Sequence, residues 1–492
     1  MHNKTKTYKK ILIYIFITTF LQVSCTKNSS KVSEITKPNI LFILADDLGY
    51  HDLSCMGSNF YETPNIDKLA ENGIRFTQAY ASHPVCSPTR AALMTGKHPN
   101  RVNITDWIPG ENPQNRQLLA PRINNELALE EITIAEKLKE KGYATYFVGK
   151  WHLGHDEQFW PEFQGFDVNI GGWEAGQPRI IRNVSNGYYS PYGNPRLKDG
   201  PEGEYLTDRL TDESIRLISE NKNKPFFLYL SYYTVHTPIQ PAKKHIDKFI
   251  QKREQLNIGE IPHQREGAGW TKLIQENAGY ASMVAAMDEN VGRVLNSLKE
   301  NGLDKNTWVF FTSDNGGRST LMRQNAETSN YPLRAGKGWC YEGGIRVPLV
   351  VQGPQVSNPG RIEETPAIST DFFSTILSIA GIEHQNNDGE NLLPLLTGKG
   401  TVERDALFWH YPHYHGSAWT PGSAIRKGDW KLVTFYEDNR TELFDLKEDP
   451  GETKDVAAEF PQKTEELKQK LIRLLHESNA RFPENNPNFV QK

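Results

Sequence analysis

The sequence predicts an α/β protein with a large, mostly parallel sheet flanked by helices and a smaller antiparallel sheet near the C-terminus. Apolar runs at residues 38–47, 225–236 and 307–315 each end in polar residues, and amphipathic stretches alternate with them. Continuous apolar runs are typical of strands buried on both faces, and parallel strands need crossover connections between them. After about residue 400 the pattern changes to short alternating stretches separated by turn residues, which indicates the antiparallel sheet.

The individual elements follow from local signals. "PNILFILADD" at residues 38–47 predicts a buried strand followed by two carboxylates. Thr133 is expected to cap a helix that runs through Lys141, and a glycine turn then leads into a strand over residues 143–148. Apolar residues at helical spacing predict a helix over residues 283–298. The other predicted elements are strands at residues 225–236, 307–313 and 347–351, a helix at 371–380, and a charged helix at 462–475.

The first 24 residues have the layout of a secretory signal peptide. Four lysines precede the apolar run "ILIYIFITTFLQVSC", which is shorter than the roughly 20 residues of a typical membrane span. The segment ends in "LQVSC", which resembles a bacterial lipoprotein cleavage site with Cys25 as the lipidated residue, and residues 25–37 are typical of a polar tether. We therefore expect export to the periplasm, or to the outer membrane or cell surface, with a membrane anchor at Cys25.

The composition argues against several classes of protein. The chain has 492 residues, of which 37% are apolar and 24% are charged, so it can bury a substantial core. A formal net charge of −4 is too mild to predict a nucleic-acid partner. Of the four cysteines, three remain if Cys25 is removed or lipidated, and no CxxC pair is present, which argues against a disulfide framework and a zinc site.

The predicted strand ends carry residues suited to a hard cation and an anionic ester. Carboxylate and amide oxygens are the ligands that Ca²⁺ and Mg²⁺ prefer. Several cations beside one divalent ion would neutralise the non-bridging oxygens of a tetrahedral oxyanion ester as its leaving group departs. This reasoning leaves phosphate and sulfate both open. The oxygen ligands are Asp46, Asp47, Asp314 and Asn315, and the cationic or proton-carrying side chains are Arg90, Lys150, His152, His236 and Lys337.

Cys86 distinguishes the two kinds of ester. The run "CSPTR", from Cys86 to Arg90, resembles the Cys-x-Pro-x-Arg signature of type I sulfatases, in which a maturation enzyme oxidises the cysteine to formylglycine. The similarity covers residues 38–355, and the exported chain, rich in Lys, Asn and Ile, is similar to the polysaccharide sulfatases of Bacteroidetes. The similarity to type I sulfatases includes, in the order found in the family, the blocks "NILFILADDLGYHDL", "TPNIDKLAENGIRFTQAYA", "GYATYFVGKWHLG", "FTSDNGG" and "GKGWCYEGGIRVPLVV".

The resemblance implies an alkaline-phosphatase-like fold, with a catalytic domain at residues 38–399 and a C-terminal subdomain at 400–492. It also implies formylglycine and Ca²⁺ as cofactors and a formylglycine-generating enzyme as a partner. One hydroxyl of the hydrated formylglycine would attack sulfur, and the second would allow the sulfate to be expelled afterwards. The implied metal ligands are Asp46, Asp47, Asp314, Asn315 and the modified Cys86. Asp314 would remove a proton from the attacking hydroxyl and His152 from the second one, while His236 or Lys337 would protonate the leaving oxygen. Arg90 and Lys150 would bind the diol and the sulfate, and Lys150, His236 and Lys337 are the implied substrate-binding residues.

Three stretches outside these motifs are candidates for a sugar pocket. Aromatic rings beside polar side chains suit a pyranose, although the tryptophans could equally pack in the core or in surface loops. The stretches are "NITDWIPG" with Asp106 and Trp107, "GGWEAGQPR" with Trp173, Glu174 and Arg179, and "FWHYPHYHG" with Trp409, His410, His413 and His415. The last stretch, expected to be a loop, is the favoured candidate for the sugar pocket. Within it, His410 and His413 are expected to bind the substrate.

The expected substrate is a sulfated glycan or its oligosaccharides, either algal, such as ulvan or carrageenan, or a host glycosaminoglycan. The sequence leaves open which sugar carries the sulfate. Two other functions also stay open: a phosphonate or phosphate ester hydrolase of the same superfamily, and a catalytically silent glycan-binding lipoprotein with the same fold.

Overall fold

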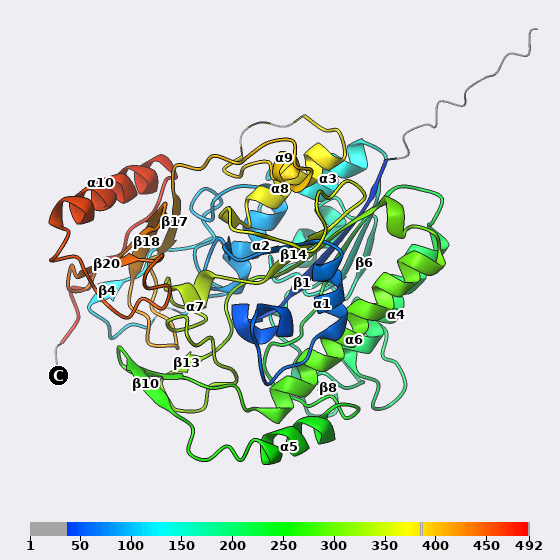
Figure 1. Cartoon of the computed structure of the whole chain (residues 1–492), viewed down its shortest axis with the longest axis horizontal. Coiled ribbons are helices and arrows are strands. Elements are labelled where there is room, and N and C mark those ends of the chain that lie inside the picture. Colours follow the sequence, from blue (N-terminus) through cyan, green and yellow to red (C-terminus); the bar gives the residue numbers. More distant parts are fainter. Residues whose placement is uncertain (1–36, 112, 384, 386, 491–492) are drawn as a thin grey trace, which may run out of the picture. The chain divides into compact units, whose positions relative to one another are not determined.

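An eight-stranded mixed sheet runs through the centre of the computed structural model (Figure 1). Its strand order is β15-β2-β14-β12-β1-β9-β5-β6, and the neighbours β12, β1, β9 and β5 are parallel to one another. The structure describes residues 37–111, 113–383, 385 and 387–490, so the predicted signal peptide, Cys25 and most of the tether lie outside the described residues. The strands are β1 (Asn39–Ala45), β2 (Ile74–Phe76), β5 (Ala144–Gly149), β6 (Val168–Ile170), β9 (Phe226–Ser231), β12 (Thr307–Ser313), β14 (Leu349–Gln352) and β15 (Arg361–Glu363).

Alternate side chains of β1 enter two different cores, one on each face of the sheet. Leu41 and Ile43 pack with helices α1, α4 and α6. Phe42 and Leu44 pack with α2, α3 and α8, which cover the opposite face (Figure 1). Because helices cover both faces, every residue of β1 is buried, which explains its uninterrupted apolar run. The helices are α1 (Pro64–Glu71), α2 (Cys86–Thr95), α3 (Ile134–Glu140), α4 (Leu206–Glu220), α6 (Ala278–Glu300) and α8 (Asp371–Ile379).

A four-stranded antiparallel sheet, β17-β18-β19-β20, forms the C-terminal part of the structure. Ile425 and Leu432 on one face pack against helix α10. Trp409 and Val433 on the other face pack against Tyr341, which joins this sheet to the larger part of the protein. The elements are β17 (Leu407–Tyr411), β18 (Gly422–Lys427), β19 (Trp430–Phe435), β20 (Thr441–Asp445) and α10 (Pro461–Glu477).

These elements confirm the predicted α/β class, with two differences of detail. The Thr133 side chain accepts a hydrogen bond from the Glu136 N–H, so it caps α3 as predicted. The strand predicted after Val347 forms β14, but it runs antiparallel to β12 and makes the sheet mixed. The stretch "FWHYPHYHG" is not a loop throughout. Its first half is β17, because Trp409 and Tyr411 alternate into the core.

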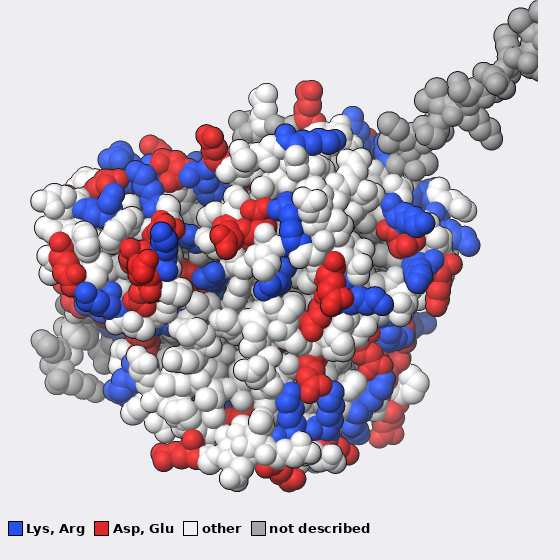
Figure 2. Space-filling model, in the orientation of Figure 1, with Lys and Arg blue, Asp and Glu red and all other residues white. Residues whose placement is uncertain are grey.

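Most of the remaining, shorter elements lie in the segments between strands of the large sheet. The described cysteines Cys55, Cys86 and Cys340 are all free. Within the described ranges, no helix is both long enough and apolar enough to span a membrane. Lys and Arg side chains are interspersed with Asp and Glu over the visible face (Figure 2). The shorter elements are β3 (Ala79–Tyr80), β4 (Leu118–Leu119), β7 (Ile180–Ile181), β8 (Ser185–Asn186), β10 (His263–Glu266), β11 (Gly269–Lys272), β13 (Thr320–Leu321), β16 (Ala367–Ile368), β21 (Glu484–Asn485), α5 (Ile246–Gln255), α7 (Glu342–Ile345) and α9 (Leu393–Leu396), with 3₁₀ turns at Tyr50–Asp52, Ser54–Met56, Glu157–Phe159, Pro161–Phe163 and Asp304–Asn306.

Candidate active site

Neighbouring parallel strands bring polar residues together at one edge of the large sheet. Asp46 follows β1, Asp314 follows β12 and Lys150 follows β5, and β9 lies between β1 and β5. Carboxyl ends of parallel strands meet at the same edge, so residues far apart in the sequence become neighbours there. We call the whole group the charged centre; its members are Asp46, Asp47, Cys86, Arg90, Lys150, His152, His236, Asp314, Asn315 and Lys337.

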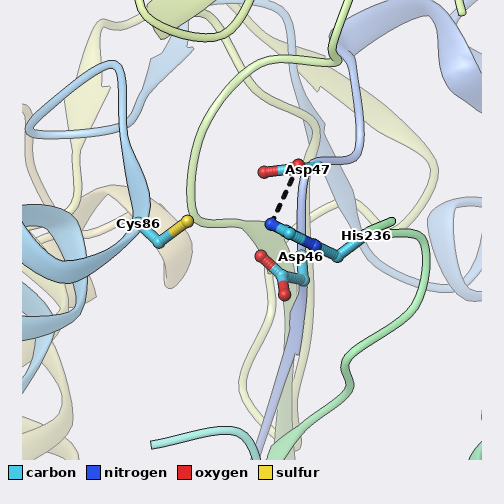
Figure 3. A group of neighbouring side chains, drawn as sticks. All are labelled: Asp46, Asp47, Cys86 and His236. Carbon is cyan, nitrogen blue, oxygen red and sulfur yellow. Dashed lines mark ion pairs between the residues drawn. The ribbon is translucent and has the colours of Figure 1, made fainter. Parts of the chain in front are cut away.

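The charged centre gathers potential metal ligands. One ligand atom from each of Asp46, Asp47, Cys86 and His236 lies within 4.8 Å of the others (Figure 3). Asp314 adjoins this group, because its Oδ1 accepts the Asp47 backbone N–H at 3.1 Å. The structure therefore brings the predicted carboxylates and Cys86 together.

Two buried oxygens of the charged centre, Asp47 Oδ2 and Asn315 Oδ1, have no hydrogen-bond partner among the described residues. The Asn315 side-chain nitrogen donates to Asp47 Oδ1 at 2.9 Å and to Gly316 O at 3.0 Å, which fixes the amide and leaves its oxygen free. A buried acceptor without a partner is costly, and a hard cation would satisfy both oxygens. The donor set fits a hard divalent ion such as Ca²⁺.

Two cations hold the carboxylates and connect the strand ends. Lys150 Nζ lies 2.9 and 2.7 Å from the two side-chain oxygens of Asp46. Arg90 Nε and Nη2 contact Asp314 Oδ2 at 2.9 and 2.7 Å, while Arg90 Nη1 donates to Lys150 O and Ser231 Oγ. Neither Arg90 nor Lys150 lines the large cavity described below. In this structure, both side chains therefore bind protein oxygens and do not reach the cavity in which a sulfate would lie.

For each of the two adjoining aspartates, burial raises the pKa and neighbouring cations lower it, and the balance differs between them. Burial raises the pKa of Asp46 to about 8, although Lys150 opposes the shift. Burial also acts on Asp47, but Lys337 and His236 outweigh it and hold the pKa of that carboxyl well below its usual range. A bound cation would favour the ionised form of both groups.

Cys86 is the first residue of α2 and faces the cavity. The residue is 2% exposed, and its Sγ lies 3.3 Å from Lys337 Nζ. The same ammonium lies 2.5 Å from Asp47 Oδ1. The Gly338 N–H donates to Pro84 O at 2.8 Å, which ties the Lys337 segment to the Cys86 segment. Lys337 is thus held between Cys86 and the carboxylates.

His152 is held as a neutral imidazole with one free nitrogen. Its Nε2 lies 2.7 Å from Ile108 O, which can only accept, so Nε2 carries the proton. Nδ1 is buried and has no partner in the described part of the chain. Burial, together with Lys150, holds the pKa of His152 well below its usual value. An ideal Cβ on Gly176 would lie 2.5 Å from the ring, so only glycine fits against this histidine.

His236 faces Asp47 from the segment that follows β9 (Figure 3). Its Nε2 lies 3.6 Å from Asp47 Oδ2, and its Nδ1 lies 2.8 Å from Thr237 O. The carbonyl can only accept, so Nδ1 carries a proton and Nε2 is the nitrogen directed to the carboxylate. His236 also lines the cavity and can therefore reach both the metal cluster and a ligand.

A cavity of about 910 Å³ adjoins the charged centre, which contributes Cys86, His152, His236 and Lys337 to its lining. We call the rest of the lining the outer wall. Its chemistry is mixed, with aromatic, acidic and basic side chains. The outer wall includes Trp107, Glu111, Glu126, His155, Asp156, Glu174, Arg179, Arg318 and His415.

Cation–carboxylate pairs stabilise the outer wall. The Arg179 guanidinium lies 4.8 Å from the centre of the Trp173 ring, and its Nη1 lies 2.9 Å from Glu174 Oε1. Arg318 Nη1 lies 2.5 Å from Glu327 Oε1. All three stretches predicted for a sugar pocket contribute to the cavity lining, through Trp107, through Glu174 and Arg179, and through His415 and Gly416.

The histidine-rich stretch differs from its prediction. His410 is fully buried in β17, with Nδ1 2.7 Å from Ser423 Oγ and Nε2 2.9 Å from Arg481 O. Both ring nitrogens are satisfied away from the cavity, so the expectation that His410 binds the substrate is wrong. His413 is 3% exposed, bonds Thr105 Oγ1 at 2.9 Å and lines not the large cavity but a neighbouring one of about 240 Å³, which shares Pro109, Glu111 and Asn125 with it. Its expected role in substrate binding stays a prediction.

Sequence reasoning missed Arg318 as a member of the site. The available signal was a cation directly after the "FTSDNGG" block. His415 is a sequence candidate for the sugar pocket but is not among the residues expected to bind the substrate, and it lines the large cavity together with Gly416. The turn after β17 determines which histidine reaches the cavity.

Two family models match this chain. The model described as Sulfatase matches residues 38–382, and the model described as N-sulphoglucosamine sulphohydrolase, C-terminal matches residues 335–481. A protein named Sulfatase from Formosa agariphila is 32% identical, over 96% of this chain and 93% of that protein.

Solved structures show the same architecture. The crystal structure of Ps i-CgsB in complex with k-i-k-neocarrahexaose has a TM-score of 0.72 and 29% identity, covering 93% of this chain and 95% of that one. A structure in complex with its substrate D-glucosamine-2-N,6-O-disulfate has a TM-score of 0.70 and 25% identity, covering 90% of this chain and 98% of that one. The alkaline-phosphatase-like fold is thereby confirmed. The chain belongs to the sulfatase family: it is a type I sulfatase of the Bacteroidetes type and a sulfuric ester hydrolase.

Proposed function

We propose that the protein hydrolyses sulfate esters of a sulfated polysaccharide, or of its oligosaccharides, with formylglycine made from Cys86 and a bound Ca²⁺. The observation that carries this proposal is the position of Cys86. Its Sγ belongs to the metal-ligand group, lies 3.3 Å from Lys337 Nζ and faces the large cavity. Cys55 and Cys340, the other described cysteines, do not line that cavity.

Calcium would be held by the unpartnered oxygens and the carboxylates of the charged centre. Bound there, it would supply positive charge against the non-bridging oxygens of the sulfate. Arg90 and Lys150 outweigh burial and hold the pKa of Asp314 below its usual range. That low pKa favours Asp314 as a metal ligand over its expected role as a base. The proposed ligands are Asp46, Asp47, Asp314, Asn315 and an oxygen of the modified residue 86.

The proton transfers are assigned to residues that face the cavity. Hydrated formylglycine supplies a geminal diol, which offers one hydroxyl for attack and a second for release of the sulfate. His152 is placed to accept a proton, because its Nδ1 is unprotonated and free. Asp47 outweighs burial and raises the pKa of Lys337, so the ammonium stays charged. This favours Lys337 as a hydrogen-bond donor to the sulfate and His236 as the acid for the leaving oxygen.

The proposed saccharide substrate rests on the cavity and on the relatives. A cavity of about 910 Å³ has room for sugar rings beyond the sulfate, and its lining includes the aromatic ring of Trp107 and the guanidinium of Arg179. One structural relative holds a neocarrahexaose and another a disulfated glucosamine. By analogy, we propose a sulfated algal glycan, such as carrageenan or ulvan, or a glycosaminoglycan.

Export is part of the same proposal. Residues 1–24 would be removed as a signal peptide, Cys25 would carry lipid, and the enzyme would act in the periplasm or at the outer membrane or cell surface. A formylglycine-generating enzyme would convert Cys86 beforehand. Mass spectrometry of the mature N-terminus is expected to find a lipid-modified Cys25, and an unmodified N-terminus upstream of it would contradict the anchor.

The test is desulfation of defined saccharides by protein produced with and without a maturation enzyme. Peptide mass spectrometry across Cys86 should find the aldehyde only in the first preparation, and only that preparation should release sulfate from a carrageenan, ulvan or glycosaminoglycan oligosaccharide. A preference for phosphate or phosphonate esters would contradict the proposal. Saccharide binding without sulfate release, with the thiol retained, would support a silent glycan-binding lipoprotein instead.

A further inference from the structure

His415 reaches the active-site cavity from the C-terminal part of the chain. It lies in a turn after β17, in which its own N–H donates to Trp419 O at 3.2 Å and its carbonyl accepts from the Ala418 N–H at 3.0 Å. An ideal Cβ on Gly338 would lie only 2.0 Å from His415 Nδ1, so the ring rests against the backbone next to Lys337. This close approach requires glycine at position 338, whose φ of 87° also favours glycine.

Hydrogen bonds from Ser417 determine which nitrogen of His415 carries the proton. The Ser417 backbone N–H donates to His415 Nδ1 at 3.2 Å, and Ser417 Oγ lies 2.7 Å from the same nitrogen. A backbone N–H can only donate, so Nδ1 is an acceptor and the neutral ring carries its proton on Nε2. No residue of the described chain is hydrogen-bonded to that Nε2.

The surroundings keep this donor uncharged. Enclosure, together with Lys337 and Arg318, lowers the pKa of His415 to about 3. Around His415 the cavity lining thus offers two cations, Lys337 and Arg318, and, close to them, a neutral N–H. The cations suit the sulfate, whereas a neutral donor suits an uncharged oxygen such as a sugar hydroxyl or ring oxygen.

We propose that His415 is a specificity-determining residue whose Nε2–H donates a hydrogen bond to an uncharged oxygen of the saccharide that carries the sulfate. This inference rests on the proposed function, since it requires a saccharide leaving group. An aryl sulfate such as para-nitrophenyl sulfate lacks that oxygen and would not use the donor.

The test compares variants of His415 on two substrates: the sulfated oligosaccharide that the wild type desulfates fastest, and para-nitrophenyl sulfate. His415→Ala should lower kcat/KM for the saccharide about tenfold and change the aryl sulfate rate less than about twofold, as for loss of one neutral hydrogen bond. His415→Gln should recover most of the loss, because its amide nitrogen occupies the place of Nε2. His415→Asn should not recover it, because its amide reaches only the place of Nδ1.

The matched control is His476→Ala, which removes an exposed histidine of α10 that lines none of the cavities described above and should change neither rate. Equal losses on both substrates, or no loss on the saccharide, would overturn the role of His415 while leaving the proposed function intact. A wild-type enzyme that cleaves the aryl sulfate but no saccharide would overturn the proposed function first, and the role of His415 with it.

Discussion

The charged centre, part of which lines the large cavity, and the outer wall of that cavity are held in different ways. Asp46 and Lys150 are fully buried and pair at 2.7 Å. The side chains of Arg179 and Arg318 are 41% and 35% exposed, and each pairs with a carboxylate on the wall or beside it. Breaking a buried pair leaves an uncompensated charge, whereas an exposed pair contributes only about 0–1 kcal/mol. Substitutions should therefore be tolerated far better at the outer wall than in the charged centre.

This contrast suggests that the charged centre determines which bond is cleaved, whereas the outer wall determines which substrate is accepted. In the proposed function the charged centre would contact the sulfate end of any substrate, so changes there should affect all substrates equally. The outer wall would contact the leaving group, so changes there should affect saccharides selectively. The following predictions test this separation.

The largest effect is expected from Cys86→Ala. Without the thiol no formylglycine can form, so sulfate release should fall by at least about 10⁴-fold on saccharide and aryl sulfate alike. The measurement is sulfate release, with Cys55→Ala as the control, since Cys55 does not line the cavity. A variant within tenfold of wild type would show that residue 86 is not the reacting group.

Removal of the metal should have the next largest effect. Chelation should lower activity about 10²–10³-fold on both substrates, and added Ca²⁺ should restore it. Calcium at a hundred times its Kd should also stabilise the fold by about 2.7 kcal/mol, measured by thermal unfolding. The Asn315→Ala variant should need more Ca²⁺ for the same activity. Unchanged activity and unfolding temperature after chelation would contradict the metal site.

His152→Ala should lower turnover of both substrates about 10²–10³-fold, because it removes the free imidazole nitrogen proposed as a base. The readout is steady-state kcat. A loss of activity confined to saccharides would show that His152 acts on the leaving group, as expected of the outer wall, and would contradict its role as a base.

Arg179→Ala should show the opposite selectivity. Its loss should raise KM for the saccharide by about tenfold, as expected for one hydrogen bond to a charged group, and leave the aryl sulfate within about twofold. Arg182→Ala is the matched control, since Arg182 lies nearby in sequence but does not line the cavity. Equal effects of the two variants on KM for the saccharide would contradict a role of Arg179 in substrate binding.

The smallest effect is expected on the pH dependence of folding stability, through Asp106, which lies next to Trp107 of the outer wall. Burial raises the pKa of Asp106 to about 7, although Tyr411 and backbone N–H groups oppose the shift. A raised pKa gives stability that is fully present below about pH 4 and is lost as the pH rises through about 7. Asp106→Asn should remove this dependence, so its stability relative to wild type should increase by about 1–3 kcal/mol between pH 5 and pH 8 in denaturant unfolding. A constant difference over that range would contradict a protonated Asp106.

Much of the charged centre could be predicted because its residues follow strands that the sequence marks clearly. The run at residues 38–47 is apolar throughout since both faces of β1 are covered, and Asp46 must then lie at the sheet edge. The same argument places Asp314 and Lys150 beside it. The order of the strands, which makes β12, β1, β9 and β5 neighbours, came only from the structure.

The outer wall shows what the sequence by itself could not determine. His410 and His415 belong to one run, yet the first lies within β17 with both nitrogens satisfied and the second turns toward Lys337. Side chains along a strand alternate between faces, so the point where β17 ends determines which histidine meets the cavity. The sequence alone determined the α/β class and predicted the reacting residue and the hard-cation ligands, because local patterns carry them. Tertiary structure decided the wall of the cavity, because its residues come from separate loops whose meeting depends on packing between the two sheets.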